Sequence, residues 1–218
     1  MSTLSPRQAY RLWAPTYSGD NAVCVLEDRI ASAMTPPTAG KRLLDAGCGV
    51  GLRLKGCGAA LAVGIDASPE MVAASGMENV TVADVQALPF AAGSFDLVWC
   101  RLMLSYLPEL RSGYAELARV CRSGGHLLLT DFHADATRAG HRQTFRDTEG
   151  RLHEINHNAH DPIEHIAAAE ASGLSLLEMQ EGAVGPSIRA LYEQKRRLDI
   201  YERDKGLRIV VAFLFTKR

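Results

Sequence analysis

The stretch LLDAGCGVG at residues 43–51 places a carboxylate, Asp45, just before three glycines at alternate positions. A glycine-rich turn lets the backbone approach a ligand closely, because glycine has no side chain. If a helix begins at the turn, its free N–H groups favour an anionic or carboxylate group. The stretch fits the GxGxxG dinucleotide fingerprint badly, because Leu52 stands where its last glycine belongs. Alone, the turn is also compatible with a plain strand-to-helix connection.

Two further acids follow predicted strands. Asp66 ends the strand in VGIDAS, where a carboxylate can accept hydrogen bonds from two ribose hydroxyls. Asp84 ends the next strand, in VTVADV, where it can accept a bond from the exocyclic amine of adenine. Each acid alone is equally compatible with a helix cap or a solvated loop. Together with the glycine turn, the acids predict a ligand crevice at the carboxyl ends of an open α/β sheet.

Four segments in order carry a resemblance to a known family: LLDAGCGVG, VGIDASPEMVAAS, VTVADVQALPFAAGSFDLVWCRLMLSYL and ELARVCRSGGHLLLTDF. The chain resembles the class I S-adenosylmethionine-dependent methyltransferases of the small-molecule type (methyltransferase type 11), over roughly residues 8–132. The resemblance implies S-adenosylmethionine as cofactor. It also implies that Gly47, Gly49 and Gly51 line the methionine part, with Asp45 nearby.

The same resemblance implies the rest of the cofactor site. Asp66 is expected to hold the ribose, and Asp84 to read the adenine amine. The other implied contacts are Ala67 and Met71 beside the adenine, the backbone of Val85 at its amine, Cys100 and Arg101 beneath the sulfonium, and Tyr10 and Tyr17 from a lid helix. Between Gly51 and Asp66 the chain is about two residues shorter than is usual in the family. We therefore expect the first helix there to be short or irregular.

Methyl transfer is an in-line displacement in which the cofactor carries the reactivity and the protein supplies alignment and a dry pocket. Orientation supplies about 7–11 kcal/mol, whereas a general base adds about 3–5 kcal/mol. We expect His133, just past the fifth strand, to lie near the methyl acceptor. His141, Arg142 and Arg146 lie on a predicted hairpin and are expected to contact the substrate. A solvated or structural role remains open for each of them.

The segment HEINH at residues 153–157 satisfies the H-E-x-x-H pattern of zinc peptidases. That geometry needs a helix, which places residues four apart on one face. In a strand, the two histidines stand roughly 13 Å apart. The flanking residues make a poor helix. We therefore expect no metal here, although His160 or His165 is a conceivable third ligand.

Alternating strand and helix patterns predict an α/β fold with mostly parallel strands. We expect a Rossmann-like, doubly wound, seven-stranded sheet whose last strand, LRIVVAFLFTKR, is antiparallel. Residues 1–40 are expected to form a helical N-terminal cover, and 41–218 the cofactor-binding domain with a lid insertion at about 141–158. Ser5 and Asp20 are expected to cap the first two helices. The segment SIRALYEQKRRLDIYERD reads as one helix with EQKRR on a solvated face.

The bulk properties are those of an ordinary globular protein. The 218 residues carry a net charge of −1, which argues against nucleic acid as a partner. Five cysteines, an odd number, indicate reduced thiols rather than a disulfide framework. Because no signal peptide or membrane-length apolar run is apparent, we expect a cytoplasmic monomer or homodimer with no membrane partner.

These observations predict methyl transfer from S-adenosylmethionine to oxygen or nitrogen of a small molecule. One alternative keeps the fold and cofactor but uses the sulfonium differently, for example by intramolecular attack that releases methylthioadenosine. Two others are a non-catalytic regulator that binds the cofactor and a zinc hydrolase. The acceptor and the choice between oxygen and nitrogen stay open.

Overall fold

A mostly parallel sheet organises the chain in the computed structural model, which describes residues 2–19 and 21–218. In this part of the chain the main sheet has seven strands in the order β4-β3-β2-β5-β6-β10-β9. Their bounds are β2 (Arg42–Ala46), β3 (Leu61–Asp66), β4 (Val80–Val82), β5 (Phe95–Arg101), β6 (Cys121–Phe132), β9 (Leu174–Ala183) and β10 (Arg208–Lys217). β10 pairs antiparallel with both β6 and β9. The predicted fold class is confirmed.

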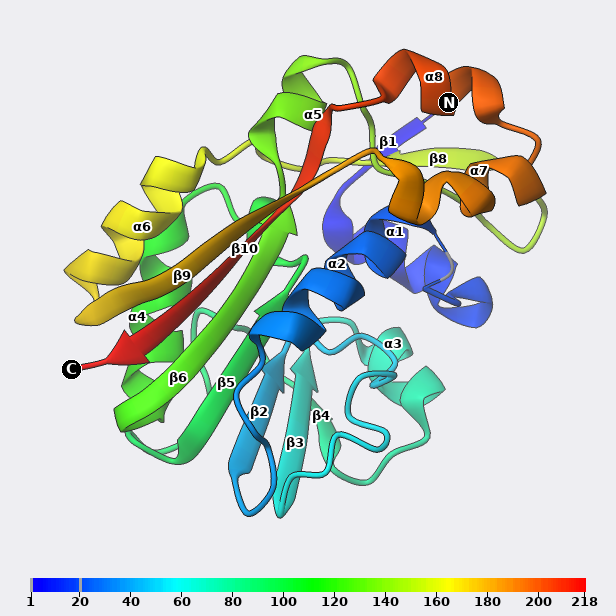
Figure 1. Ribbon diagram of the computed structural model, residues 1–218. Helices are drawn as coiled ribbons and strands as arrows, with labels where there is room; N and C mark the ends of the chain where they lie inside the picture. Colours follow the sequence, from blue (N-terminus) through cyan, green and yellow to red (C-terminus); the bar gives the residue numbers. More distant parts are fainter. Residues whose placement is uncertain (1, 20) are drawn as a thin grey trace.

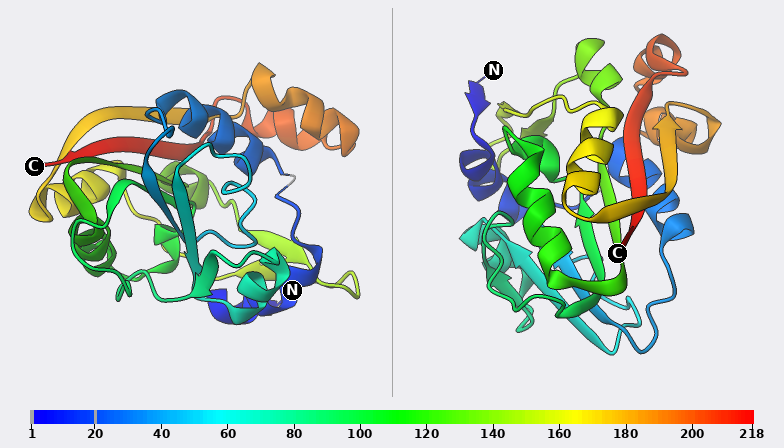
Figure 2. Two further views of the ribbon diagram at one scale, coloured as in Figure 1. Left: turned by 90° about the horizontal axis from the view of Figure 1, so that it is seen from below. Right: turned by 90° about the vertical axis from the view of Figure 1, so that its left-hand side faces the viewer.

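Helices cover both faces of this sheet, so its central strands are apolar throughout. α4 (Leu110–Val120) and α6 (Pro162–Ala171) lie side by side on one face, as the right-hand view of Figure 2 shows. α2 (Ala22–Met34) lies on the other face (Figure 1). Alternate strand residues enter the two cores: Leu44 and Val98 on the α4 side, and Leu43 and Leu97 on the α2 side.

The sheet contains a topological switch point. β2 pairs with β3 on one side and with β5 on the other, both in parallel. The connections that leave β2 and β5 therefore run in opposite directions across the sheet, which opens a crevice beyond the carboxyl ends of these two strands. The glycine turn follows β2 directly, and Arg101 ends β5.

Local capping explains where the helices around this crevice begin. Ser5 caps α1 (Pro6–Trp13), and Pro6 stands at its first turn as predicted; the short helix η1 (Ala14–Thr16) follows. Asn21 caps α2 by accepting a hydrogen bond from Cys24 N at 2.9 Å. The predicted cap Asp20 lies outside the described residues. Ser68 caps α3 (Pro69–Ser75) in the same way.

The predicted hairpin forms from β7 (Thr144–Arg146) and β8 (Leu152–Ile155), which pair antiparallel. The N-terminal strand β1 (Ser2–Leu4) pairs parallel with β8 and so forms a second small sheet with the hairpin. Because α1 follows β1 in the chain, this pairing connects α1 to the hairpin. The short helices α5 (Ala134–Arg138) and η2 (Leu104–Tyr106) follow β6 and β5. All of these segments gather at the carboxyl ends of the main strands (Figure 1).

Two predicted helices differ in the structure. The connection from β2 to β3 forms turns over residues 52–56 instead of a helix, in agreement with the expected irregularity. The predicted helix from Ser187 to Asp204 is broken into η3 (Pro186–Ile188), α7 (Arg189–Gln194) and α8 (Leu198–Asp204). The break falls at Arg196, whose φ of 53° no helix interior accommodates. Among the described residues, no helix is long and apolar enough to cross a membrane.

Candidate functional site

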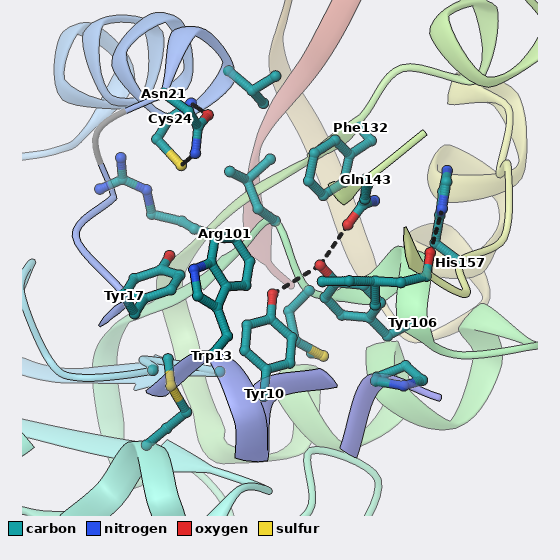
Figure 3. A pocket seen from close by; sticks show the side chains of 18 of the residues that line it. Tyr10, Trp13, Tyr17, Asn21, Cys24, Arg101, Tyr106, Phe132, Gln143 and His157 are labelled. Atoms are coloured by element: carbon teal, nitrogen blue, oxygen red, sulfur yellow. Dashed lines mark hydrogen bonds between the residues drawn. The ribbon is translucent and has the colours of Figure 1, made fainter. Parts of the chain in front are cut away.

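A single continuous cavity of about 730 Å³ lies over the carboxyl ends of β2 to β6. Its floor comes from the turns after these strands. Its walls come from α1, the first turn of α2, α5, the arms of the β7–β8 hairpin, and α7 and α8 (Figure 3). Residues far apart in the sequence therefore line one cavity, which is typical of a ligand site.

The glycine turn forms one end of the cavity. Gly47 and Gly49 line it with φ values of 81° and 56°, a left-handed conformation that favours glycine. A Cβ at Gly47 would lie 2.7 Å from Met103 Cγ. Gly51 does not line the cavity, because it faces α3, where a Cβ would lie 2.8 Å from Met77 Sδ. The prediction that Gly51 contacts the cofactor is therefore wrong, and this glycine serves packing.

Asp66 ties the glycine turn to the end of β3. Its Oδ2 accepts a hydrogen bond from Gly49 N at 2.8 Å, and its Oδ1 accepts one from Ser68 N at 2.9 Å. Burial raises the pKa of Asp66, while these two bonds oppose the rise. Each oxygen keeps a second lone pair, and the residue lines the cavity. Asp66 therefore both shapes the turn and is placed to accept two hydroxyls.

The predicted adenine end lies next to Asp66. Ala67, Met71, Asp84 and Val85 all line the cavity. Met71 and Val85 are buried, whereas Asp84 is exposed and accepts a hydrogen bond from Gln86 N at 2.9 Å. The structure brings these residues together as an apolar slot with one acid at its edge. Their contacts with adenine stay a prediction.

Asp45 lies behind the glycine turn rather than on the cavity wall. It is fully buried, and neither carboxylate oxygen has a hydrogen-bond partner among the described residues. Burial raises the pKa of Asp45 to about 6, against the opposing charges of Arg53 and Arg101. A buried polar group without a partner is costly. The charge of Asp45 attracts a cation through the glycine turn without direct contact, so this acid suits the ammonium group of the predicted cofactor.

We predict that S-adenosylhomocysteine binds more weakly as the pH falls through 6, because protonation of Asp45 removes the negative charge that attracts the ligand's ammonium group through the glycine turn. The loss of affinity should level off at about tenfold, which corresponds to a change of about one in the pKa of Asp45 on binding. Calorimetric titration across this range measures the effect. Methylthioadenosine, which lacks the ammonium, and the Asp45→Asn variant should show no such dependence. The same pH dependence in the variant would contradict the assignment.

Arg101 lines the cavity and forms a buried ion pair with Glu27 of the N-terminal cover. Its Nε and Nη2 donate to Glu27 Oε1 and Oε2 at 2.6 and 2.9 Å, and Nη2 also donates to Asp28 Oδ1 at 2.9 Å. Cys100, its neighbour on β5, points to the opposite face because side chains alternate along a strand. Cys100 is fully buried in the core on the α4 side, so the prediction that it lies beneath the sulfonium is wrong.

The sequence interpretation missed Arg53, which lines the cavity beside the glycine turn. Its Nη2 lies 3.3 Å from Glu27 Oε2, and its side chain is 20% exposed. A guanidinium in this position fits a carboxylate, and the predicted cofactor carries one at the same end as its ammonium. No pattern signalled this residue, because the turn around it had been expected to be a short helix.

A cluster of aromatic side chains forms part of the cavity wall. Tyr10 and Tyr17 line it as predicted, with Trp13 and Tyr106. Tyr10 Oη lies 2.8 Å from Tyr106 Oη, which donates to Gln143 Oε1 at 2.6 Å (Figure 3). Burial raises the pKa of Tyr10 and Tyr106, and it raises that of Tyr17 to about 12. These phenols therefore stay protonated and act as hydrogen-bonding and packing groups.

His133 does not face the cavity. Its side chain is buried, its Nε2 lies 2.9 Å from Glu181 Oε1 on β9, and its Nδ1 accepts a hydrogen bond from Asp135 N. Both ring nitrogens are thus used to cap α5 and join it to the sheet edge. The prediction that His133 lies near the acceptor is wrong.

Of the three residues predicted to contact the substrate, two line the cavity and one does not. His141 and Arg142 line the cavity, with His141 Nε2 2.9 Å from Asp204 Oδ2 and Arg142 Nε 3.3 Å from Glu154 Oε1. Arg146 points along the hairpin and donates to Gly150 O at 2.7 Å, outside the cavity. The prediction for Arg146 is therefore wrong, because this residue lies next to the hairpin turn, where its guanidinium bonds the turn backbone.

The HEINH segment does not form a helix. His153 lies on β8 and contacts Asp147 Oδ2 at 2.8 Å, whereas His157 follows the strand and contacts Thr137 Oγ1 at 3.1 Å. The two rings thus face separate partners, and no described residues form a group of three metal ligands. The zinc hydrolase alternative fails on this geometry. His157 lines the cavity, as do Lys195 and Arg197 from EQKRR, which had been expected to face solvent.

Comparisons with known proteins agree with this geometry. The sequence model of a family described as "Methyltransferase domain" matches residues 44–129. Malonyl-acyl-carrier protein O-methyltransferase from Enterobacter lignolyticus is 34% identical over 135 residues, covering 56% of this chain and 51% of that protein. The protein of the same name from Dechloromonas aromatica is 30% identical over 184 residues, covering 80% of this chain and 67% of that protein.

A solved S-adenosylmethionine-dependent methyltransferase from Mesorhizobium loti shares the fold, with a TM-score of 0.68 and 21% identity. The match covers 88% of this chain and 98% of that one. The chain spans about half the length of the first curated relatives it matches.

Proposed function

The chain belongs to the S-adenosylmethionine-dependent methyltransferases, with S-adenosylmethionine as cofactor, and from this premise we propose that it methylates an oxygen or nitrogen of a small molecule. One observation carries the proposal. The cavity is lined not only by the turns after the strands but also by residues of α5, the hairpin, α7 and α8, and we call this part of it the second chamber. Such a chamber suits a small acceptor, because its walls limit the access of water to the reacting atoms.

The lining residues suit different parts of the two reactants. The cofactor supplies an electrophilic methyl group when it is bound. Asp66 suits the nucleoside end of the cofactor, and Gly47, Gly49 and Arg53 suit its amino acid end. Tyr10 and Tyr106 contribute neutral hydroxyls to the cavity wall. Alignment of this kind is the main source of rate in such a displacement.

We also propose that the hairpin region and the N-terminal helices act as a cover over the cavity. The β1–β8 pairing joins these two segments, and both contribute lining residues. We propose as well that the protein works as a monomer or homodimer, without a nucleic acid partner.

Incubation with methyl-labelled S-adenosylmethionine and a panel of small phenols, alcohols, amines and carboxylic acids tests the function. The panel includes a malonyl thioester, because named relatives act on malonyl-acyl carrier protein. Labelled product with release of S-adenosylhomocysteine supports methyl transfer. Methylthioadenosine formed without any acceptor would instead indicate self-directed chemistry. Cofactor binding without turnover of any acceptor would indicate a regulator.

A further inference from the structure

The second chamber contains two of the described histidines, His141 and His157. His141 is engaged through Nε2 with the buried carboxylate of Asp204, which also accepts two hydrogen bonds from Arg203. This nitrogen faces a carboxylate rather than a bound acceptor, and His141 joins the hairpin arm to α8. The Nε2 of His157, in contrast, faces a hydroxyl group.

The contacts of His157 determine which nitrogen is free to accept a proton. Nδ1 lies 3.2 Å from the carbonyl oxygen of Ile155, which can only accept, so Nδ1 carries the hydrogen. In the neutral ring, Nε2 is then the acceptor, and Thr137 Oγ1 donates to it at 3.1 Å. Both Thr137 and His157 line the chamber. The backbone thus orients the ring as a base that reaches the chamber through a hydroxyl.

The surroundings of His157 are otherwise uncharged. The ring contacts Thr137 of α5, the Ile155 carbonyl of β8, and Phe132 of β6, whose ring centroid is 6.3 Å away. Two charged side chains of the flanking elements pair elsewhere: Arg138 with Asp161, and Glu154 with Arg142. These contacts of the ring thus include no charged side chain.

Other features of the chamber favour a neutral oxygen acceptor. The amide nitrogen of Gln143 is buried with no acceptor among the described residues, while its Oε1 is held by Tyr106. This amide can donate to an oxygen of the ligand. Arg101, which is buried, is already paired with Glu27 and Asp28 and is therefore not free to bind a carboxylate acceptor.

Resting on the proposed function, we infer that the acceptor is a small molecule with a hydroxyl group, and that Thr137 and His157 remove its proton. The acceptor hydroxyl donates its proton to Thr137 Oγ1 as the hydroxyl proton of Thr137 passes to His157 Nε2. The acceptor oxygen bonds to the methyl carbon, and the C–S electron pair goes to sulfur. The imidazolium then releases its proton to water, so the step needs no further reactant.

The test uses two phenols of different acidity. 4-Nitrophenol is largely ionised at slightly alkaline pH and needs no base, whereas 4-methoxyphenol stays protonated. His157→Gln and Thr137→Val should lower kcat/KM for 4-methoxyphenol by about 100-fold or more, and leave 4-nitrophenol within a few-fold. Thr137→Ser should restore the loss. His126→Gln, on β6 outside the cavity, is the matched histidine control and should change neither.

A second measurement does not depend on turnover. NMR of the imidazole nitrogens should show hydrogen on Nδ1 of His157 and none on Nε2 in the neutral ring. Equal loss with both phenols, no loss with either, or no phenol methylated by the wild-type protein would overturn the inference. Transfer to carboxylic acids or amines alone would overturn it as well, yet leave the proposed function intact. Failure to bind S-adenosylhomocysteine would mark failure of the proposed function instead.

Discussion

Asp66→Asn is expected to weaken binding of S-adenosylhomocysteine by about 100-fold or more. Asp66 is expected to accept two ribose hydroxyls while it also holds the N–H groups of Gly49 and Ser68. An amide keeps one acceptor oxygen, and its NH2 group would face one of these backbone donors whichever way it turns. Hydrogen bonds to a charged acceptor contribute about 1.5–3 kcal/mol each. Loss of two such bonds corresponds to at least about 100-fold in affinity.

Calorimetric titration measures this loss, and the choice of ligand locates it. Methylthioadenosine contains the ribose, so its binding should weaken as much as that of S-adenosylhomocysteine. This pattern differs from the one expected for Asp45, which affects only ligands with the amino acid end. Asp96→Asn is the matched control, because Asp96 also accepts a backbone bond, from Arg42 N, but lies at the amino ends of the strands. Unchanged affinity in Asp66→Asn would show that the nucleoside does not lie at β3.

The main sheet and the nucleoside end of the site could be predicted because their signals are local. Apolar runs that end in glycine or an acid mark the strands, and the carboxyl ends of parallel strands share one edge of the sheet. Asp66 and Asp84 were placed at the cavity by this reasoning alone, and the structure brings both to it. Gly47 and Gly49 could be placed at the cavity for the same reason, since they come directly after β2.

The acceptor end could not be predicted, because it depends on contacts between distant segments. His133 and His157 both follow a strand, yet the ring of the first turns toward Glu181, 48 residues away, and the second enters the chamber. The break at Arg196, which helical periodicity does not reveal, brings Lys195 and Arg197 to the cavity. The family resemblance implied that the neighbours Cys100 and Arg101 both lie beneath the sulfonium. Strand alternation allows only one of two neighbouring side chains to face the crevice.

The ion pair between Glu27 and Arg101 joins residues 74 positions apart and connects the N-terminal cover to the strand ends. Glu27 is fully buried on α2. Besides Arg101, it accepts from Thr130 Oγ1 at 2.7 Å and from Arg53 Nη2 at 3.3 Å. Burial opposes ionisation of Glu27, but the bonds from Arg101 and the charge of Arg53 outweigh it and lower its pKa. One carboxylate thus holds two cavity-lining guanidinium groups in place.

Glu27→Ala should destabilise the protein by about 3–5 kcal/mol, because removal of one partner leaves buried charge uncompensated. For a chain of this length, the melting temperature should fall by roughly 6–20 °C in thermal unfolding followed by circular dichroism. Asp28→Ala is the control within the same cluster, since the Asp28 side chain is 63% exposed and its pair with Arg101 contributes at most about 1 kcal/mol. The double variant Glu27→Met with Arg101→Met should regain much of the loss, because an apolar pair removes both buried charges together. Equal small effects of Glu27→Ala and Asp28→Ala would contradict this account, since the cover would then be held by its apolar contacts alone.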